Sequence, residues 1–397
     1  MINQTIVRNN TLYYFFSFFF MNLGRTLPHA ILTIFLLDAG LNLAQIAYLQ
    51  IAYMITILLF EIPSGHYSDK WSRKYTYVFS IVFLFAAYLI IYIGHSNLYL
   101  LILAWTLYGL SAALNSGTME SELINQIKAA NKSVKKIAIW NSYITSISSA
   151  LGAIIGSVLY VKISSNMYLI TFLCFLISFF VALFFKVDRT ENEHKSGTEE
   201  IKKEEVLLKQ KLIKLLKNKD TQELIVLFTL LSLFLQPYFQ YWQVLFGDKG
   251  ISITFFGVLF VVFQFCNITG TYIYGKLNYK EKYSIYILSL MIIVTIIMLL
   301  NNNTIIFLIL FMTMLILFYI YYQDIYVKLR ERSDDSNIST LSSFIGTSMN
   351  FSSIIVLIFF SQTINYFSLS YNYLIYFIFF YVISILVIKV YTKVNES

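Results

Sequence analysis

The sequence predicts an all-α membrane protein of twelve transmembrane helices, arranged as two pseudo-symmetric six-helix bundles. Of its 397 residues, 58% are apolar and only 13% are charged, whereas about a quarter of an ordinary soluble chain is charged. Twelve apolar stretches are each long enough to cross about 30 Å of hydrocarbon. The longest polar stretch, residues 187–219, separates the first six stretches from the last six.

The expected spans follow one another with short loops between them. They cover residues 12–37, 44–65, 75–95, 98–120, 137–160, 166–186, 221–246, 252–275, 282–300, 303–327, 338–360 and 371–391. If the N-terminus is cytoplasmic, all but three of the 29 basic residues lie at the inner side, the exceptions being Arg25, Lys162 and Lys249. Since Lys and Arg accumulate in cytoplasmic loops, we expect both termini in the cytoplasm and the chain in the plasma membrane.

The domain organisation follows from this layout. We expect an N-terminal bundle over residues 1–186, a cytoplasmic amphipathic linker over 187–219 and a C-terminal bundle over 220–397. Pro28 and Pro237, and likewise Gly65 and Gly275, are separated by the same distance to within one residue. Such an offset is typical of a duplicated six-helix unit, an arrangement common among transporters.

The loop after the second span reads Gly65-His66-Tyr67-Ser68-Asp69-Lys70-Trp71-Ser72-Arg73-Lys74. Gly65 allows a sharp turn where a helix ends, Asp69 places a carboxylate at the inner membrane edge, and Arg73 offers two parallel donors to a second carboxylate. The loop resembles the signature Gly-x-x-x-Asp-Arg/Lys-x-Gly/Ser-Arg-Arg/Lys of the major facilitator superfamily. The alternative is a basic loop that only fixes the topology.

The resemblance implies a conformational latch that locks the cytoplasmic side of the N-terminal half against the C-terminal half when the transporter opens outward. Its residues would be Gly65, Asp69, Arg73 and Lys74, with Glu120 as the partner of Arg73. Glu120 belongs to a segment, residues 116–122, that is similar to a Ser-Gly-Thr-x-Glu segment of bacterial members. An exposed carboxylate with no such role is the alternative for Glu120.

Arg25 falls near the centre of the first span, where an arginine costs about 2.5–3.5 kcal/mol. No carboxylate is expected at its depth, so we predict that Arg25 faces a cavity and binds an anionic or strongly electronegative group of a substrate. His29 would share its helix face, and Pro28 should bend the helix between them. The alternative is that Arg25 and His29 bind backbone carbonyls.

Polar residues of the second half are expected at the same depth. Amides and one indole in the seventh and eighth spans could line a substrate cavity between the halves, or bond to neighbouring helices. They are Gln236, Gln240, Trp242, Gln264 and Asn267. In the fifth span, Gly152 and Gly156 should let another helix approach closely.

The expected function is transport driven by a gradient. There is no phosphate-binding loop, no His-Glu-x-x-His motif and no Cys/His cluster, so we expect no enzyme, cofactor or metal. The net charge of +8 reflects topology and does not indicate nucleic acid. The candidate proton carriers are His29, Glu61 and Asp324, although Lys328 four residues after Asp324 favours a salt bridge there.

The leading hypothesis is a monomer in the lipid bilayer that exports a drug-like or amphipathic small molecule by proton antiport. It rests on the resemblance to bacterial exporters. Proton-coupled uptake of a small anionic solute is the second hypothesis, which Arg25 favours. A membrane receptor or immunity protein that keeps the fold without transporting is the third.

Overall fold

The computed structural model describes the backbone of residues 4–70, 72–116, 118–130, 135–187, 218–277, 283–332 and 338–395. It describes side chains throughout these ranges except at residues 62, 65–67, 69–70, 135–136, 138–139, 283–285, 330–332, 338–340, 342–343 and 383–395. In the described ranges every element is helical. Eight helical segments of this part of the chain are long and apolar enough to cross a membrane. The expected linker helix lies outside the described residues.

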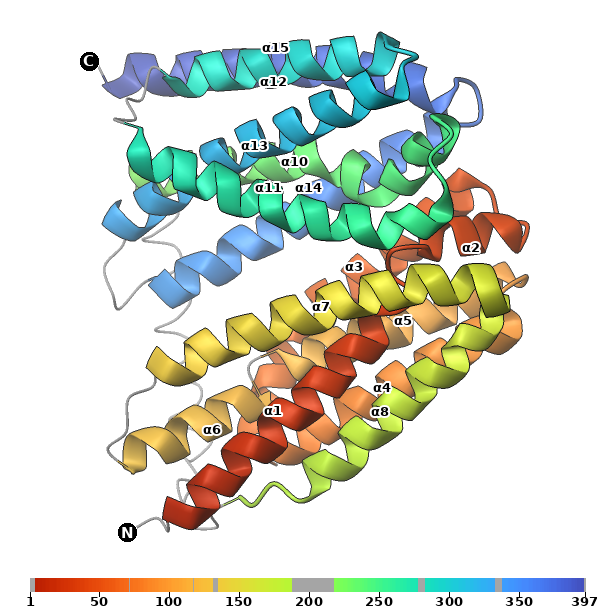
Figure 1. Ribbon diagram of the computed structural model, residues 1–397. Coiled ribbons are helices and arrows are strands. Elements are labelled where there is room, and N and C mark those ends of the chain that lie inside the picture. The colour runs from red at the N-terminus through yellow and green to blue at the C-terminus, as the bar shows by residue number, and fades with distance from the viewer. Residues whose placement is uncertain are drawn as a thin grey trace. The chain divides into compact units, whose positions relative to one another are not determined.

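The chain divides into two compact units, and unit 1 comprises residues 1–194 with 252–261. Helix α1 packs on α7 and α8, α3 packs on α5, and α4 contacts both α5 and α8 (Figure 1). The largest fully buried side chains of this unit include Tyr77, Tyr168 and Phe175. Its helices are α1 (Gln4–Thr26), α2 (Leu32–Asp38), α3 (Leu43–Lys70), α4 (Arg73–Gly94), α5 (Leu98–Asn115), α6 (Thr118–Ala129), α7 (Lys135–Ile163), η1 (Ser164–Asn166) and α8 (Met167–Leu183).

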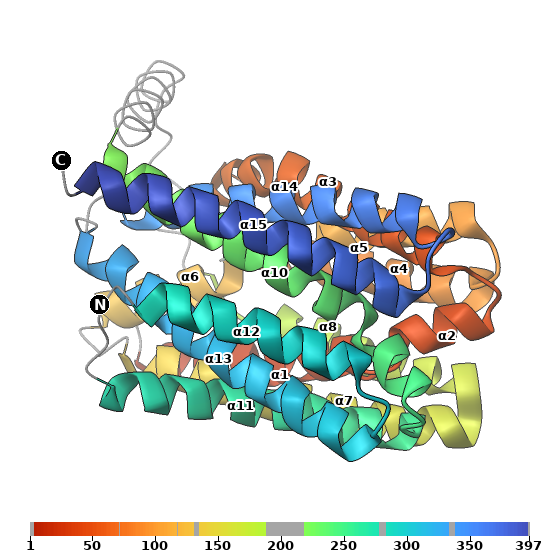
Figure 2. The same cartoon turned by 90° about the horizontal axis from the view of Figure 1, so that it is seen from above.

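Unit 2 comprises residues 195–251 and 262–397. Helix α10 packs on α14 and runs alongside α15, which also contacts α12 (Figure 2). The stacked and tilted rings of Phe234, Tyr238, Tyr373 and Phe377 pack together in its core. Its helices are α10 (Lys219–Asp248), most of α11 (Phe256–Lys276), α12 (Tyr283–Leu300), α13 (Thr304–Arg332), α14 (Ile338–Thr363) and α15 (Leu369–Asn395). The short η3 (Ile253–Phe255) and the start of α11 belong to unit 1, where η3 packs against α7.

Three expected helix limits need correction. The first span is two helices, because residues 27–31 form turns around Pro28. The second span does not end at Gly65 but continues to Lys70, since a single glycine costs a long helix only about 1 kcal/mol. The fourth span is interrupted after Asn115, and α6 begins at Thr118.

Candidate functional site

Arg25 is the last residue but one of α1, immediately before the break at Pro28. The His29 N–H donates to the Thr26 carbonyl at 3.1 Å, whereas a continuous α-helix would direct it to the carbonyl of Arg25. The Tyr88 phenol on α4 donates to that Arg25 carbonyl at 2.9 Å. The structure thus confirms that the helix is distorted at Pro28, and Tyr88 fixes its backbone there.

Glycines on α7 make room for the break. A β-carbon on Gly152 would collide with the Thr26 hydroxyl, and one on Gly156 would collide with the Leu27 carbonyl. The predicted close approach at this pair is therefore confirmed, and the approaching segment is the end of α1.

The Arg25 guanidinium binds a neutral amide. Its Nη2 donates to Asn22 Oδ1 at 2.6 Å, one turn earlier on α1. Asn22 Nδ2 in turn lies 2.7 Å from Ser148 Oγ and 2.9 Å from Ser149 Oγ on α7. Within the described part of the chain, no carboxylate forms an ion pair with Arg25. A guanidinium has five N–H donors, and among the described residues this one uses only Nη2, toward Asn22.

Two tyrosines lie near Arg25, because its charge acts on the phenols of Tyr53 and Tyr88, and a third, Tyr108, packs against both of their rings. The ring of Tyr108 is centred 4.9 Å from Tyr53 and 5.8 Å from Tyr88. Tyr53 and Tyr108 are half-buried, and Tyr88 is buried. We call Asn22, Arg25, Tyr53, Tyr88 and Tyr108 the Arg25 cluster. It combines a cation with an aromatic wall, which suits a ligand that carries an electronegative group on an apolar body.

His29 does not follow Arg25 on a continuous helix, because the turns at residues 27–31 interrupt the expected i, i+4 relation. Its side chain is exposed, and its ring meets Phe260 edge-on at 6.1 Å between centroids. The expected continuous helix between Arg25 and His29 was therefore wrong, although His29 still lies near enough to Arg25 to feel its charge.

The expected cavity residues of unit 2 have different surroundings. Trp242 is buried in an aromatic cluster, with its ring 5.3 Å from Phe263 and 5.8 Å from Phe246. Among the amides, Gln236 is buried, Gln240 is half-buried and Gln264 is exposed, while Asn267 Oδ1 accepts a 3.4 Å hydrogen bond from Thr271. Substrate contact by these residues stays a prediction.

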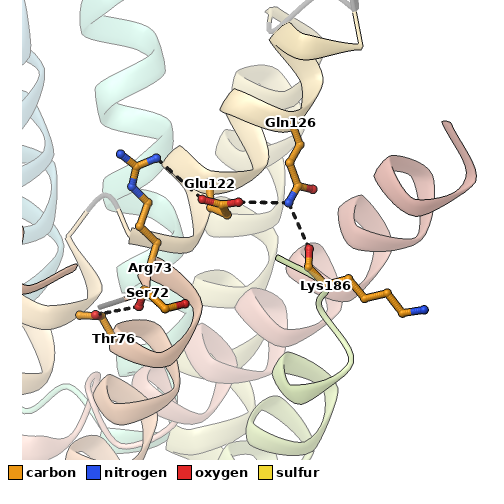
Figure 3. Close-up of polar contacts among 6 residues, drawn as sticks. All are labelled: Ser72, Arg73, Thr76, Glu122, Gln126 and Lys186. Carbon is orange, nitrogen blue, oxygen red and sulfur yellow. Dashed lines mark hydrogen bonds and ion pairs between the residues drawn. The ribbon is translucent and has the colours of Figure 1, made fainter. Parts of the chain in front are cut away.

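A second polar site lies at the start of α4 and along α6 of unit 1 (Figure 3). Arg73 Nη1 is 3.8 Å from Glu122 Oε2, and Glu122 Oε1 accepts from Gln126 Nε2 at 3.2 Å. Gln126 also donates to the Lys186 carbonyl at 3.1 Å. The Asn10 side chain bonds both Gln126 Oε1 and the backbone of Lys186. This network joins α1, α4, α6 and the chain that leaves α8.

The expected partner of Arg73 was wrong by two residues. Glu122 and not Glu120 forms the ion pair, because residues two apart on a helix differ in direction by about 200°. Lys74 donates to the Leu183 carbonyl at 2.7 Å, at the end of α8. The surroundings of Gly65 and the side chain of Asp69 lie outside what the structure describes.

The two remaining candidate proton carriers differ in burial. Glu61 is exposed on α3. Asp324 is buried on α13, with its Oδ2 3.1 Å from Lys328 Nζ. The predicted Asp324–Lys328 salt bridge is confirmed.

Sequence reasoning missed Asn22, Tyr88, Gln126 and Asn10. Asn22 could have been found, since it precedes Arg25 by three residues and so shares its helix face. The others act on residues far away in sequence, and no local pattern indicates such pairings.

Comparisons with known proteins agree with this architecture. The family model of the Major Facilitator Superfamily matches residues 14–357. Similar solved structures include a mutant form of the nucleoside transporter NupG (TM-score 0.73, 11% identity, 98% of this chain and 99% of that one). A bacterial homologue of the iron transporter ferroportin has TM-score 0.70 and 16% identity, covering 95% and 98%. A bacterial homologue of the human lysosomal transporter Spinster has 0.68 and 12%, covering 100% and 97%.

The family model covers most of the chain, and the structural likeness extends over nearly its whole length. None of the curated protein sequences matches it. The apolar helices and the matched fold make it a multi-pass membrane protein with the fold of small-molecule transporters. The chain belongs to the Major Facilitator Superfamily.

Proposed function

We propose that this chain is a proton-coupled secondary transporter that exports a small amphipathic molecule bearing an anionic or strongly electronegative group. The observation that carries this proposal is the Arg25 guanidinium. It binds a single neutral amide oxygen, has no carboxylate partner among the described residues, and lies near the phenols of Tyr53 and Tyr88, on which its charge acts. A cation in a membrane span is costly, and a ligand that bonds to it offsets that cost during transport.

The substrate contact is prepared in advance. Asn22, which accepts from the guanidinium, is itself held by hydrogen bonds to two serines of α7. Tyr88 holds the Arg25 backbone by donating to its carbonyl. Ligand binding then costs little side-chain entropy at this residue. The half-buried Tyr53 ring supplies apolar surface near the charge, and the half-buried Tyr108 ring packs against it; this favours an amphipathic ligand over a small hydrophilic ion.

The mechanism we propose is alternating access by two bundles, residues 1–186 and 220–397, joined by the linker 187–219. The chain would cross the plasma membrane twelve times as a monomer with both termini in the cytoplasm. The Arg73–Glu122 pair joins α4 to α6 at the inner end, so its making and breaking would accompany the change of conformation. His29 and Glu61 are the proposed proton carriers.

Uptake of a small anion is the second candidate function. It is favoured by the unused donors of Arg25, since they recognise any carboxylate whether or not an apolar body accompanies it.

The experiment is flux through proteoliposomes under an imposed proton gradient of either sign. The compounds would be an aromatic carboxylate, an aliphatic carboxylate of similar length and the neutral amide of the first. Export is expected for the aromatic acid. A protonophore should abolish it, and transport that ignores the gradient would point to a facilitator.

The matched variants are Arg25→Gln, Arg25→Lys and, as a control at the far end of α7, Lys162→Gln. A charge-assisted hydrogen bond is worth about 1.5–3 kcal/mol, so Arg25→Gln should raise the apparent KM for the acids by about tenfold or more. The apparent KM of Arg25→Lys should lie between those of the wild type and Arg25→Gln, because lysine keeps the charge but lacks the planar guanidinium. Unchanged acid transport by Arg25→Gln would refute the assignment, and loss of expression would make Arg25 architectural.

A further inference from the structure

A groove of about 200 Å³ lies between α4 and α8 of unit 1. Its lining is wholly apolar and consists of Ile81, Val82, Phe85, Phe175, Leu176 and Phe179. Ile81 and Phe175 form a buried floor, while Val82 and Leu176 are 44% and 43% exposed at its mouth. The groove therefore opens on the outer surface of two apolar helices, where a membrane protein meets lipid tails.

Lys74 lies beyond one end of this groove, where α4 and α8 are in contact. Lys74 precedes Ile81 by seven residues and Phe85 by eleven, so all three lie on one face of α4. Its ammonium donates to the Leu183 carbonyl at 2.7 Å, and Leu183 follows Phe179 by one helical turn on α8. Lys74 thus bridges α4 and α8 in line with the groove, and it has donors left over because an ammonium has three.

The spacing of charge and groove matches one lipid molecule. By helical rise, the groove begins about 10 Å from Lys74 along α4 and ends about 17 Å from it. Half of the hydrocarbon core is about 15 Å thick, with a headgroup layer of about 5–7 Å outside it. A phosphate at Lys74 would therefore place its own acyl chain in the groove. The exposed Tyr75 ring, 5.7 Å from the Lys74 ammonium, is of the type found at the membrane interface.

We propose that the α4–α8 groove is a binding site for an anionic phospholipid, with the headgroup phosphate on Lys74 and one acyl chain between Val82 and Leu176. The apolar lining excludes a polar ligand, and the cation at its end selects an anionic headgroup. The bound lipid covers the seam beside Arg73, the neighbour of Lys74, at the inner end of unit 1.

Native mass spectrometry of the full chain in detergent tests this proposal. Phosphatidylglycerol and phosphatidylcholine with identical acyl chains are titrated separately. The wild type should bind phosphatidylglycerol more tightly. Lys74→Gln should weaken that binding about fivefold, since one lysine near an anionic lipid surface is worth about 1 kcal/mol. Lys74→Arg should keep the preference.

A second variant tests the part of the groove that would hold the acyl chain. Val82→Trp fills the mouth of the groove and should weaken binding of both lipids. The controls are Val258→Trp, at another exposed valine of unit 1, and Lys128→Gln, at an exposed lysine on α6; both should bind as the wild type does. Equal affinity for the two lipids, or equal losses in the controls, would overturn the proposal. So would sensitivity to Val82→Trp without sensitivity to Lys74→Gln, because the headgroup would then play no part.

Discussion

Pro28 follows the first helix of unit 1, and Pro237 lies within the first described helix of unit 2, yet the helices around them differ. Pro28 separates α1 from α2, whereas Pro237 lies inside the continuous helix α10. In a helix, Pro237 cannot donate to the Leu233 carbonyl four residues earlier. The phenol of Tyr376 on α15 donates to that carbonyl at 2.8 Å instead.

Both halves thus use a tyrosine from another helix to bond a carbonyl near the proline. In unit 2 the tyrosine replaces the missing bond and the helix continues, and a second tyrosine, Tyr373, bonds the Pro237 carbonyl at 2.6 Å. In unit 1 Tyr88 bonds the carbonyl of Arg25, and the helix stops. The difference places a charged side chain at the break in unit 1 and an aromatic core around the proline in unit 2.

The largest expected effect comes from Gly156, which accommodates the break in unit 1. Gly156→Ala would place a methyl group on the Leu27 carbonyl, and backbone cannot move aside as a flexible side chain can. The free energy of unfolding should fall by an amount at or above the ~1–3 kcal/mol typical of overpacking. Purified yield and the thermal unfolding midpoint are the measurements.

The matched control is Gly346→Ala on α14, where nothing lies within 4 Å of the added β-carbon. Alanine should be neutral there or stabilise the helix by about 0.5–1 kcal/mol. Similar losses in the two variants would show that α1 and α7 can separate without cost, and would remove the packing argument for the break.

The next largest effect concerns Pro237, which lies inside the continuous helix α10. Tyr376→Phe leaves the Leu233 carbonyl without its donor, which should cost about 1–3 kcal/mol of unfolding free energy. Pro237→Ala restores an N–H that can bond to that same carbonyl. Tyr376→Phe should therefore cost much less in the Pro237→Ala background, as measured by a double-mutant cycle on unfolding. Equal costs in both backgrounds would mean that Tyr376 stabilises unit 2 only by packing.

Much of this architecture could be predicted from sequence, because apolar length and a fixed motif report the membrane fold directly. Two further features were predictable because each depends on spacing within one helix: that no described carboxylate pairs with Arg25, and that Gly152 and Gly156 admit a close neighbour. The Glu122 partner of Arg73 was not predictable, because it depends on where α6 begins after α5 ends at Asn115. Tyr88 and Tyr376 were not predictable either, since each acts on a helix distant in sequence.

The smallest expected effect on stability comes from removing a salt bridge, and each unit has one that can be compared. Arg73–Glu122 joins two helices of unit 1, whereas Asp324–Lys328 lies within the single helix α13 of unit 2. Removing both members of a pair leaves no buried charge without a partner, so the doubles Arg73→Gln/Glu122→Gln and Asp324→Asn/Lys328→Gln should each change unfolding by about 1 kcal/mol or less. Transport should distinguish them.

The unit 1 double should cut flux strongly, because a contact between helices can break and re-form when they move, and the contact within α13 cannot serve in that way. Flux through proteoliposomes and cysteine accessibility from each side of the membrane would measure this. If the Arg73→Gln/Glu122→Gln variant transported normally, the loop of residues 65–74 would serve only to fix the membrane topology. If the unit 2 double lost proton-driven flux while keeping gradient-independent exchange, Asp324 would be a proton carrier after all, and its salt bridge with Lys328 only its resting state.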